Sequence, residues 1–142
     1  MIYTPMTKKA LILCFQAHKG QVDKSGLPYV FHPFHLAEQM NDEITTIVAL
    51  LHDVVEDTPV APDDLRDQGF PEEAVAAIRL MTHDKGVPYL EYVARIKENP
   101  IARTVKLADL RHNSDLSRLD EVGEKDLARV EKYKKAMELL GK

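Results

Sequence analysis

The sequence has one cysteine and no long run of apolar residues, and each shortage excludes a class of protein. A lone thiol, at Cys14, cannot form an internal disulfide, which fits a reducing cytoplasm better than a secreted, disulfide-stabilised domain. No segment approaches the ~20 apolar residues of a membrane span, and the N-terminus lacks the apolar core and cleavage site of a signal peptide. We therefore expect a cytoplasmic protein without a membrane partner, in which Cys14 is buried and unreactive.

Basic residues are also in short supply, because 19 Lys and Arg stand against 23 Asp and Glu, for a net charge of -4. Proteins that bind nucleic acids usually carry a basic excess, so this balance argues against a nucleic-acid partner. A small anionic ligand needs only local positive charge and stays compatible with the composition. The sequence leaves the oligomeric state open, and a homo-oligomer is compatible with it.

Almost every long segment has the apolar periodicity and the end signals of a helix, and no segment has a pattern that predicts a strand. The predicted helices cover residues of about 4–19, 33–40, 43–57, 63–69, 71–82, 88–98, 99–116 and 124–140. Residues 20–31 and 83–87 are predicted to be loops. Because linkers, repeats and low-complexity tracts are lacking, residues 1–142 are expected to form one domain. The predicted fold is all-α, an orthogonal helical bundle whose site lies where several helices converge.

The densest chemistry lies in the sequence ALLHDVVEDT, residues 49–58. His52 and Asp53 offer a nitrogen and an oxygen ligand, a mixed set that suits Mn, Fe or Zn. In a helix, Glu56 shares one flank with both of them, and Asp57 lies one turn beyond Asp53. Carboxylates near the end of a helix oppose its dipole, which a bound cation would compensate. The alternative is a helix end with acidic surface residues.

Two further metal-ligand candidates come from other segments. His32 lies in the aromatic-rich sequence PYVFHP, and its simpler interpretation is a partly buried loop histidine. Asp109 lies in the apolar sequence VKLADL, where a carboxylate is costly to bury unless it is paired or coordinates a metal. A salt bridge to a basic neighbour is the alternative there. Together, His32, His52, Asp53 and Asp109 are predicted to form a metal site with two His and two Asp ligands.

Lys24, Lys106, Arg111 and Arg129 are the basic candidates for an anionic ligand, although each could equally be a solvated surface charge. Arg129 and Tyr133 lie one turn apart, so they could share a ligand or pack against each other. The remaining histidines receive lesser roles. His35 is expected to pack beside His32, His83 to be solvated in its loop, and His18 and His112 to stand outside the site.

Four motifs follow one another along the chain: HKGQ at 18–21, GLPYVFHP at 26–33, LLHDVVEDT at 50–58 and VKLAD at 105–109, the last followed by HN at 112–113. In this order they resemble the hydrolase domain of RelA/SpoT-type proteins, within the HD phosphohydrolase superfamily. The resemblance covers about residues 8–135 and is closer to the stand-alone small alarmone hydrolases. It implies an all-helical HD fold that binds one Mn²⁺ and removes the 3′-pyrophosphate from ppGpp.

The resemblance also implies a role for each motif residue. His32, His52, Asp53 and Asp109 would be the metal ligands. Glu56 and Asp57 would position and deprotonate the attacking water. The residues that would hold the nucleotide are Lys24, Asn113, Arg129 and Tyr133.

Two departures from the family pattern affect the substrate. The family usually has Q-x-R-K where this chain has QVDK at 21–24, so Asp23 replaces an arginine that packs on the guanine base. A carboxylate cannot stack as a guanidinium does. The usual D-R-L-H-N is DLRHN at 109–113, which moves the basic residue by about 100° around a helix. Metal chemistry is expected to survive both changes.

The resemblance therefore implies hydrolysis of ppGpp, while Asp23 keeps other 3′-phosphorylated nucleotides, such as ppApp or NADPH, as alternative substrates. A non-catalytic, alarmone-binding module is the alternative from another class. Glu56 and Asp57 argue against that alternative, because a pure binding protein does not need them.

Overall fold

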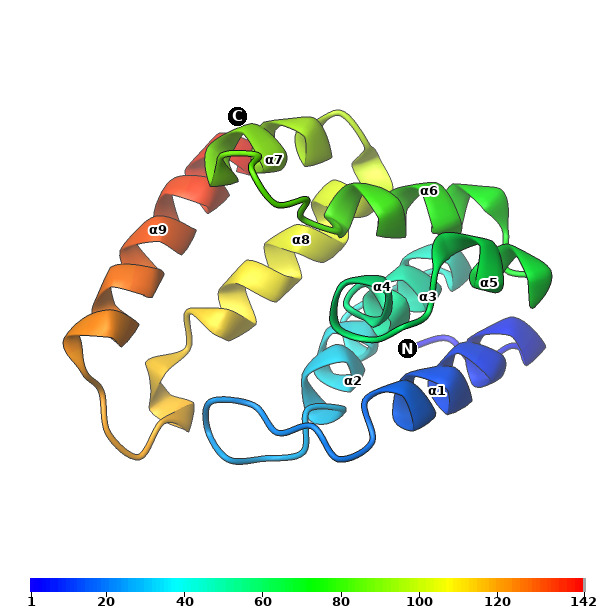
Figure 1. Ribbon diagram of the computed structural model, residues 1–142, viewed down its shortest axis with the longest axis horizontal. Helices are drawn as coiled ribbons and strands as arrows, with labels where there is room; N and C mark the ends of the chain where they lie inside the picture. Colours follow the sequence, from blue (N-terminus) through cyan, green and yellow to red (C-terminus); the bar gives the residue numbers. More distant parts are fainter. Residues whose placement is uncertain (142) are drawn as a thin grey trace.

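The computed structural model describes residues 1–141, and within that range the chain consists of helices and connecting loops (Figure 1). The elements are α1 (Pro5–Ala17), α2 (Phe31–Glu38), α3 (Glu43–Leu51), α4 (Val54–Asp57), α5 (Pro62–Asp67), α6 (Glu72–Met81), α7 (Tyr89–Lys97), α8 (Pro100–Asn113), the 3₁₀ turn η1 (Leu116–Arg118) and α9 (Glu124–Gly141). No strand forms over these residues, so the prediction of an all-α fold is confirmed. Over the same residues, no helix is both long and apolar enough for a membrane crossing.

Helix α3 forms the centre of the molecule, because every residue from Thr45 to Leu51 is buried. The helices α1, α2, α6 and α8 all pack against it. Each large aliphatic side chain buried there contributes roughly 1.5–3 kcal/mol to folding. Helix α9 lies at the opposite side of α8 from α1, and packs on α7 and α8 (Figure 1). Helix α8 therefore connects the α3 core with the outer α7–α9 layer.

The start of α8 follows directly from local sequence signals. The Asn99 side chain accepts hydrogen bonds from the backbone N–H groups of Ile101 and Ala102, at 3.0 and 3.1 Å. Pro100 occupies the first helical position, where its missing N–H costs nothing. The predicted end near residue 116 is wrong, because α8 stops at Asn113 and Asp115 caps the separate turn η1. The buried residues of α8 include Ala102, Val105 and Asp109, so Asp109 lies on the side of the helix that faces the core.

The prediction of one helix over residues 43–57 is also wrong. Helix α3 ends at Leu51 and the short α4 begins at Val54, so the helical structure is interrupted at His52 and Asp53. Neighbouring residues of a continuous helix diverge by about 100°, whereas this break lets both side chains reach one site. The carboxylates of Glu56 and Asp57 lie on α4 and not at the end of a long helix, so the argument from its dipole does not apply. Helix α2 begins two residues earlier than predicted.

Candidate metal centre and active site

Three segments bring the four predicted metal ligands together. His32 comes from α2, His52 and Asp53 from the break between α3 and α4, and Asp109 from α8. Each residue offers one ligand atom, and these atoms all lie within 4.8 Å of one another. The two histidines and Asp109 are buried, and Asp53 is partly buried. A nitrogen and oxygen set of this kind suits a divalent cation such as Mn, Fe or Zn.

The orientation of His52 favours a cation at this position. Its Nδ1 atom lies 2.7 Å from the backbone carbonyl of Ala49, so this nitrogen carries the proton. The opposite nitrogen, Nε2, lies 3.0 Å from Asp53 Oδ2 and 3.5 Å from Asp109 Oδ1. Among residues 1–141 that nitrogen is buried without a hydrogen-bond partner. If His52 were neutral, its Nε2 lone pair would point at two carboxylates, so this position requires positive charge, either a proton on Nε2 or a bound cation.

The electrostatics of the cluster lead to the same conclusion. Burial by itself would lower the pKa of His52, but the Asp53 and Asp109 carboxylates outweigh it and hold that pKa well above its ordinary value. Burial would raise the pKa of Asp109, yet Lys106 together with His32 and His52 lowers it well below its usual range. Two ionised carboxylates therefore favour positive charge between them.

Neighbouring side chains hold the ligands in place. His32 Nε2 lies 2.8 Å from Asp109 Oδ1, and Asn113 donates to the same oxygen at 3.0 Å. The other oxygen of Asp109 accepts a hydrogen bond from Lys106 at 2.9 Å. The salt bridge considered as the alternative for Asp109 is thus present beside the cluster, and Lys106 is committed to it. Tyr29, which the sequence analysis did not single out, donates its hydroxyl to Asp53.

Glu56 and Asp57 border a cavity of about 240 Å³ that Asp53 and Asp109 also line. Burial, with the added charge of Asp53, raises the pKa of Asp57 to about 6. Burial also raises the pKa of Glu56, even though Glu56 accepts a hydrogen bond from the backbone N–H of His83 at 2.9 Å. A carboxylate with a pKa near 6 is a suitable proton acceptor at neutral pH.

The prediction that His83 is solvated is wrong. Its ring is partly buried and stacks on Tyr92, with 4.4 Å between the ring centroids. Its Nε2 atom lies 2.6 Å from the carbonyl of Val87, which closes the loop after α6. This loop supplies the backbone N–H that holds Glu56, and His83 itself lines the same cavity as Glu56 and Asp57.

His112 also lies closer to the site than expected. Its Nδ1 atom is 2.6 Å from Nδ1 of His32, and the two rings stack with 4.9 Å between their centroids. The exposed ring of His35 lies 4.3 Å from that of His112. The rings of three histidines thus lie next to one another beside the cluster, on the side of α2.

A second cavity of about 380 Å³ adjoins the first, because Tyr29, Asn113 and Tyr133 line both. All four predicted nucleotide-binding residues border it, namely Lys24, Asn113, Arg129 and Tyr133. Arg129 pairs with Asp126 on the same helix, and Tyr133 lies one turn further along α9. The volume lies within the range of small-molecule pockets. Arg111, by contrast, is exposed and lines neither of these two cavities.

Asp23, the residue that replaces the family's arginine, also borders the larger cavity. Beside it lies Arg118, which the sequence analysis did not single out. The two residues are 95 positions apart, so no local pattern could have paired them. Their contact depends on how the loop after α1 meets η1.

A scan of the chain against models of known protein families found no match. Among curated proteins, the chain is 36% identical over 135 residues to the guanosine-3′,5′-bis(diphosphate) 3′-pyrophosphohydrolase MESH1 of Mus musculus, an alignment that covers 84% of this chain and 74% of the relative. It is 33% identical over 122 residues to the bifunctional (p)ppGpp synthase/hydrolase SpoT of Escherichia coli K12, covering 75% of this chain and 17% of SpoT. The GTP pyrophosphokinase of Myxococcus xanthus is 30% identical over 140 residues, 87% of this chain and 18% of that protein.

The chain thus spans less than a fifth of the two long bacterial relatives. Among solved structures, it is similar to a metazoan ortholog of SpoT that is described as hydrolysing ppGpp. The two share 25% sequence identity and superpose with a TM-score of 0.77, over 99% of this chain and 88% of the other. The overall helical arrangement of this chain is therefore similar to that of the metazoan protein.

Proposed function

Since this chain belongs to the RelA/SpoT-type family of HD hydrolases, we propose that it removes the 3′-pyrophosphate from ppGpp, with water as the other reactant. The products are pyrophosphate and GDP, or GTP when the substrate is pppGpp. The observation that supports this most directly is the buried, unpartnered Nε2 of His52 among two carboxylates, beside the acids Glu56 and Asp57. Such a set is suited to metal-assisted hydrolysis.

The proposed cofactor is one Mn²⁺, held by His32, His52, Asp53 and Asp109. When bound, this ion would polarise a phosphate oxygen and lower the pKa of a water molecule. The chain's own residues prepare the site for it. Tyr29 and Asn113 fix the two carboxylates by hydrogen bonds, and Ala49 sets the ring of His52.

Asp57 is the proposed proton acceptor, because burial already raises its pKa to about 6. It takes the proton of the attacking water, while Glu56, anchored by the His83 backbone, orients that water. Precise orientation of the reactants is itself a large part of such catalysis. Both acids border the cavity on the metal side, where the 3′-pyrophosphate would lie.

The nucleoside would occupy the larger cavity. Lys24 and Arg129 supply positive charge there, and Tyr133 supplies an aromatic wall. Asn113 borders both cavities, which suits a residue that contacts the ribose between base and reacting phosphate. The lone, buried thiol of Cys14 fits the cytoplasm, which is the location we propose.

The direct test is to incubate the purified protein with Mn²⁺ and ppGpp and to quantify GDP and pyrophosphate by ion-exchange chromatography. Asp53→Ala is the control, and it should lose turnover by at least about 100-fold, because it removes a metal ligand. Unchanged ppGpp in the presence of wild type would refute this substrate. Equal turnover by the variant would trace the activity to a contaminant.

A second substrate class is supported by Asp23, because this carboxylate lines the larger cavity where the family has an arginine. The same reaction would then act on ppApp, which also carries a 3′-pyrophosphate. NADPH carries its extra phosphate as a monoester at the 2′ position, so its hydrolysis would release orthophosphate and not pyrophosphate. Comparing kcat/KM for the three nucleotides on the same preparation decides between them. Tight binding of ppGpp without turnover of any of the three would instead favour a non-catalytic, alarmone-binding module.

A further inference from the structure

The larger cavity contains a guanidinium to which the proposed reaction gives no role. Arg118 of η1 lines this cavity and keeps 26% of its side chain exposed. Its Nη1 atom lies 3.4 Å from Asp23 Oδ2, and its Nη2 atom donates to the carbonyl of His112 at 3.1 Å. Its Nε atom is buried, which closes that donor to a ligand. Both terminal nitrogens of Arg118 are thus held by neighbouring oxygens, which fixes the plane of the guanidinium.

Asp23 is itself held rigidly by the loop after α1. Its Oδ1 atom accepts hydrogen bonds from the backbone N–H groups of Ser25 and Leu27, at 2.9 and 3.1 Å. The Ser25 hydroxyl donates to the same oxygen at 2.6 Å. Burial would raise the pKa of Asp23, but these hydrogen bonds and Arg118 outweigh it and lower that pKa. A charged, immobile carboxylate therefore presents its remaining oxygen to Arg118.

The way Arg118 is bound decides what it can offer a ligand. Its positive charge is balanced by Asp23, and most of its donors are engaged or buried, so it is a poor clamp for phosphate. What remains is the flat face of the guanidinium. Such faces stack on aromatic rings, including the bases of nucleotides. Phosphate groups have a better partner nearby in Lys24, which lines the same cavity.

We propose that Arg118 is the base-stacking residue of the larger cavity and that Asp23 is the residue that positions it. This inference rests on the proposed function for the identity of the substrate and adds the element that selects its base. The ligand class is a nucleotide with a purine base, whose two fused rings cover more of the guanidinium than one ring does. Asp23 thus supports the base through Arg118 without touching it.

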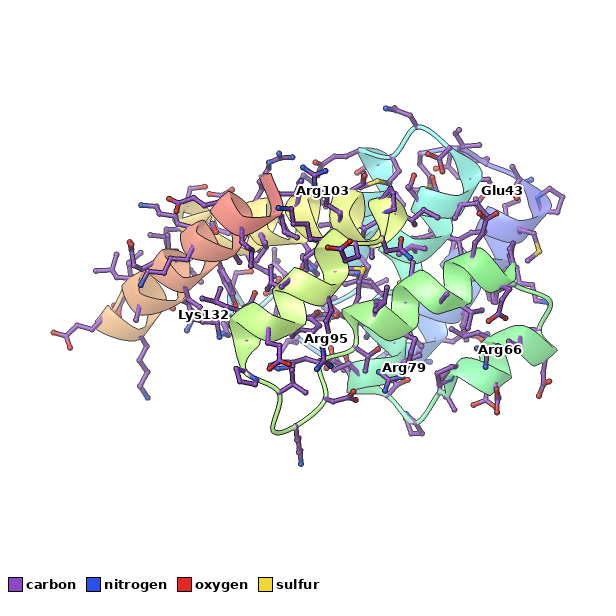
Figure 2. All side chains as sticks on the ribbon, turned by 90° about the horizontal axis from the view of Figure 1, so that it is seen from above. Glu43, Arg66, Arg79, Arg95, Arg103 and Lys132 are labelled. Carbon is purple, nitrogen blue, oxygen red and sulfur yellow. The ribbon has the colours of Figure 1, made fainter. Side chains whose placement is uncertain are left out.

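The variants Arg118→Ala and Arg118→Lys separate stacking from charge. Both should raise the KM for ppGpp about 10-fold, the size of effect that stacked bases give, with little change in kcat. Lysine keeps the charge but lacks the plane, so it should not rescue alanine. Arg66→Ala is the matched control. Arg66 lies on α5, forms an ion pair with Glu72 and lines neither cavity. It lies at the opposite end of the molecule from Lys132, which lines the metal-side cavity (Figure 2).

Inhibition by pyrophosphate, which has no base, tests the same distinction. Its inhibition constant should be equal for wild type and Arg118→Ala, whereas a phosphate-binding role would raise it in the variant. The positioning role of Asp23 is tested with Asp23→Asn. This variant should raise KM about threefold in the wild-type background and have no effect in Arg118→Ala, since contacts in one network are not additive.

The inference would be overturned if Arg118→Lys restored the wild-type KM for ppGpp, or if pyrophosphate inhibited Arg118→Ala more weakly than wild type. It would also be overturned if Asp23→Asn and Arg118→Ala had additive effects on KM. Titration calorimetry of ppGpp binding to Mn²⁺-loaded Glu56→Gln separates it from the proposed function. If wild type hydrolyses no nucleotide but Arg118→Ala still weakens ppGpp binding about 10-fold in the Glu56→Gln background, the stacking role holds and only the reaction fails. Equal binding with and without Arg118 refutes the stacking role whatever the activity.

Discussion

A divalent cation held by His32, His52, Asp53 and Asp109 would stabilise the folded chain, so Mn²⁺ should raise its melting temperature. The Asp53 and Asp109 carboxylates face the buried Nε2 atom of His52 at 3.0 and 3.5 Å and raise the pKa of His52 well above its ordinary value, so this position attracts positive charge that a divalent cation would supply. The unfolded chain does not hold these residues together, because they come from three separate segments. The free energy of binding therefore adds to the free energy of unfolding.

The size of the shift follows from mass action. At a free Mn²⁺ concentration 100 times the dissociation constant, binding adds about 2.7 kcal/mol to the free energy of unfolding. For a domain of this length, each kcal/mol moves the melting temperature by roughly 3–4 °C. We therefore expect a rise of about 8–11 °C, and a further rise with each tenfold increase in Mn²⁺.

The assay is thermal unfolding by circular dichroism, on protein stripped with EDTA and then titrated with Mn²⁺. Helix α2 provides a matched pair of variants, because His32 is buried in the cluster and His35 is exposed three residues later. His35→Gln should keep the full shift. His32→Gln should lose most of it at the same Mn²⁺ concentration, because one of four ligands is gone.

An unchanged melting temperature of wild type across the titration would refute the reasoning, provided that the stripped protein is folded at the start. So would an equal shift in wild type and His32→Gln, since the ion would then bind elsewhere. Because His32 also contacts Asp109 at 2.8 Å, the melting temperature of each metal-free variant is the baseline for its own shift.

Three further predictions concern Asp57, Lys106 and Asn99. Asp57 accepts a proton only when it is ionised, so kcat/KM should fall as the pH drops through about 6. A bound cation would offset the repulsion from Asp53 and move this fall to a somewhat lower pH. Asp57→Asn should lose at least about 100-fold in kcat, and its pH profile should no longer show this fall. Lys106→Met leaves the buried Asp109 without its ion partner, so in EDTA the free energy of unfolding measured in urea should fall by about 3–5 kcal/mol, and Mn²⁺ should restore part of it. A loss below about 1 kcal/mol would show that Asp109 finds other compensation. Asn99→Ala removes the cap of α8 and should cost about 1 kcal/mol in the same assay, with Asn99→Asp as the variant that retains the cap.

The helical character of the chain and several helix ends were predictable, because local interactions determine them. Asn99 and Pro100 begin α8 through contacts within three residues, and Thr4 caps α1 in the same way. The choice of His32, His52, Asp53 and Asp109 as a set came from their ligand chemistry and local context, and the motif resemblance implied the same four residues. The structure brings their ligand atoms together. Their role as metal ligands remains a prediction for the titration above.

Other features escaped the sequence because they depend on contacts between distant segments. The apolar periodicity runs on through residues 43–57, so only the fold shows that the helix breaks at His52. His83 belongs to a polar loop by its neighbours, yet Tyr92 of α7 packs on it.

The sequence by itself determined the all-α class and which residue types are available for chemistry, since helix formation and capping act over a few residues. Only the tertiary structure decided that Lys106 is occupied by Asp109 and that Asp23 faces Arg118 across 95 residues. Those pairings arise where packed helices and loops meet, and burial there turns ordinary charged side chains into fixed partners.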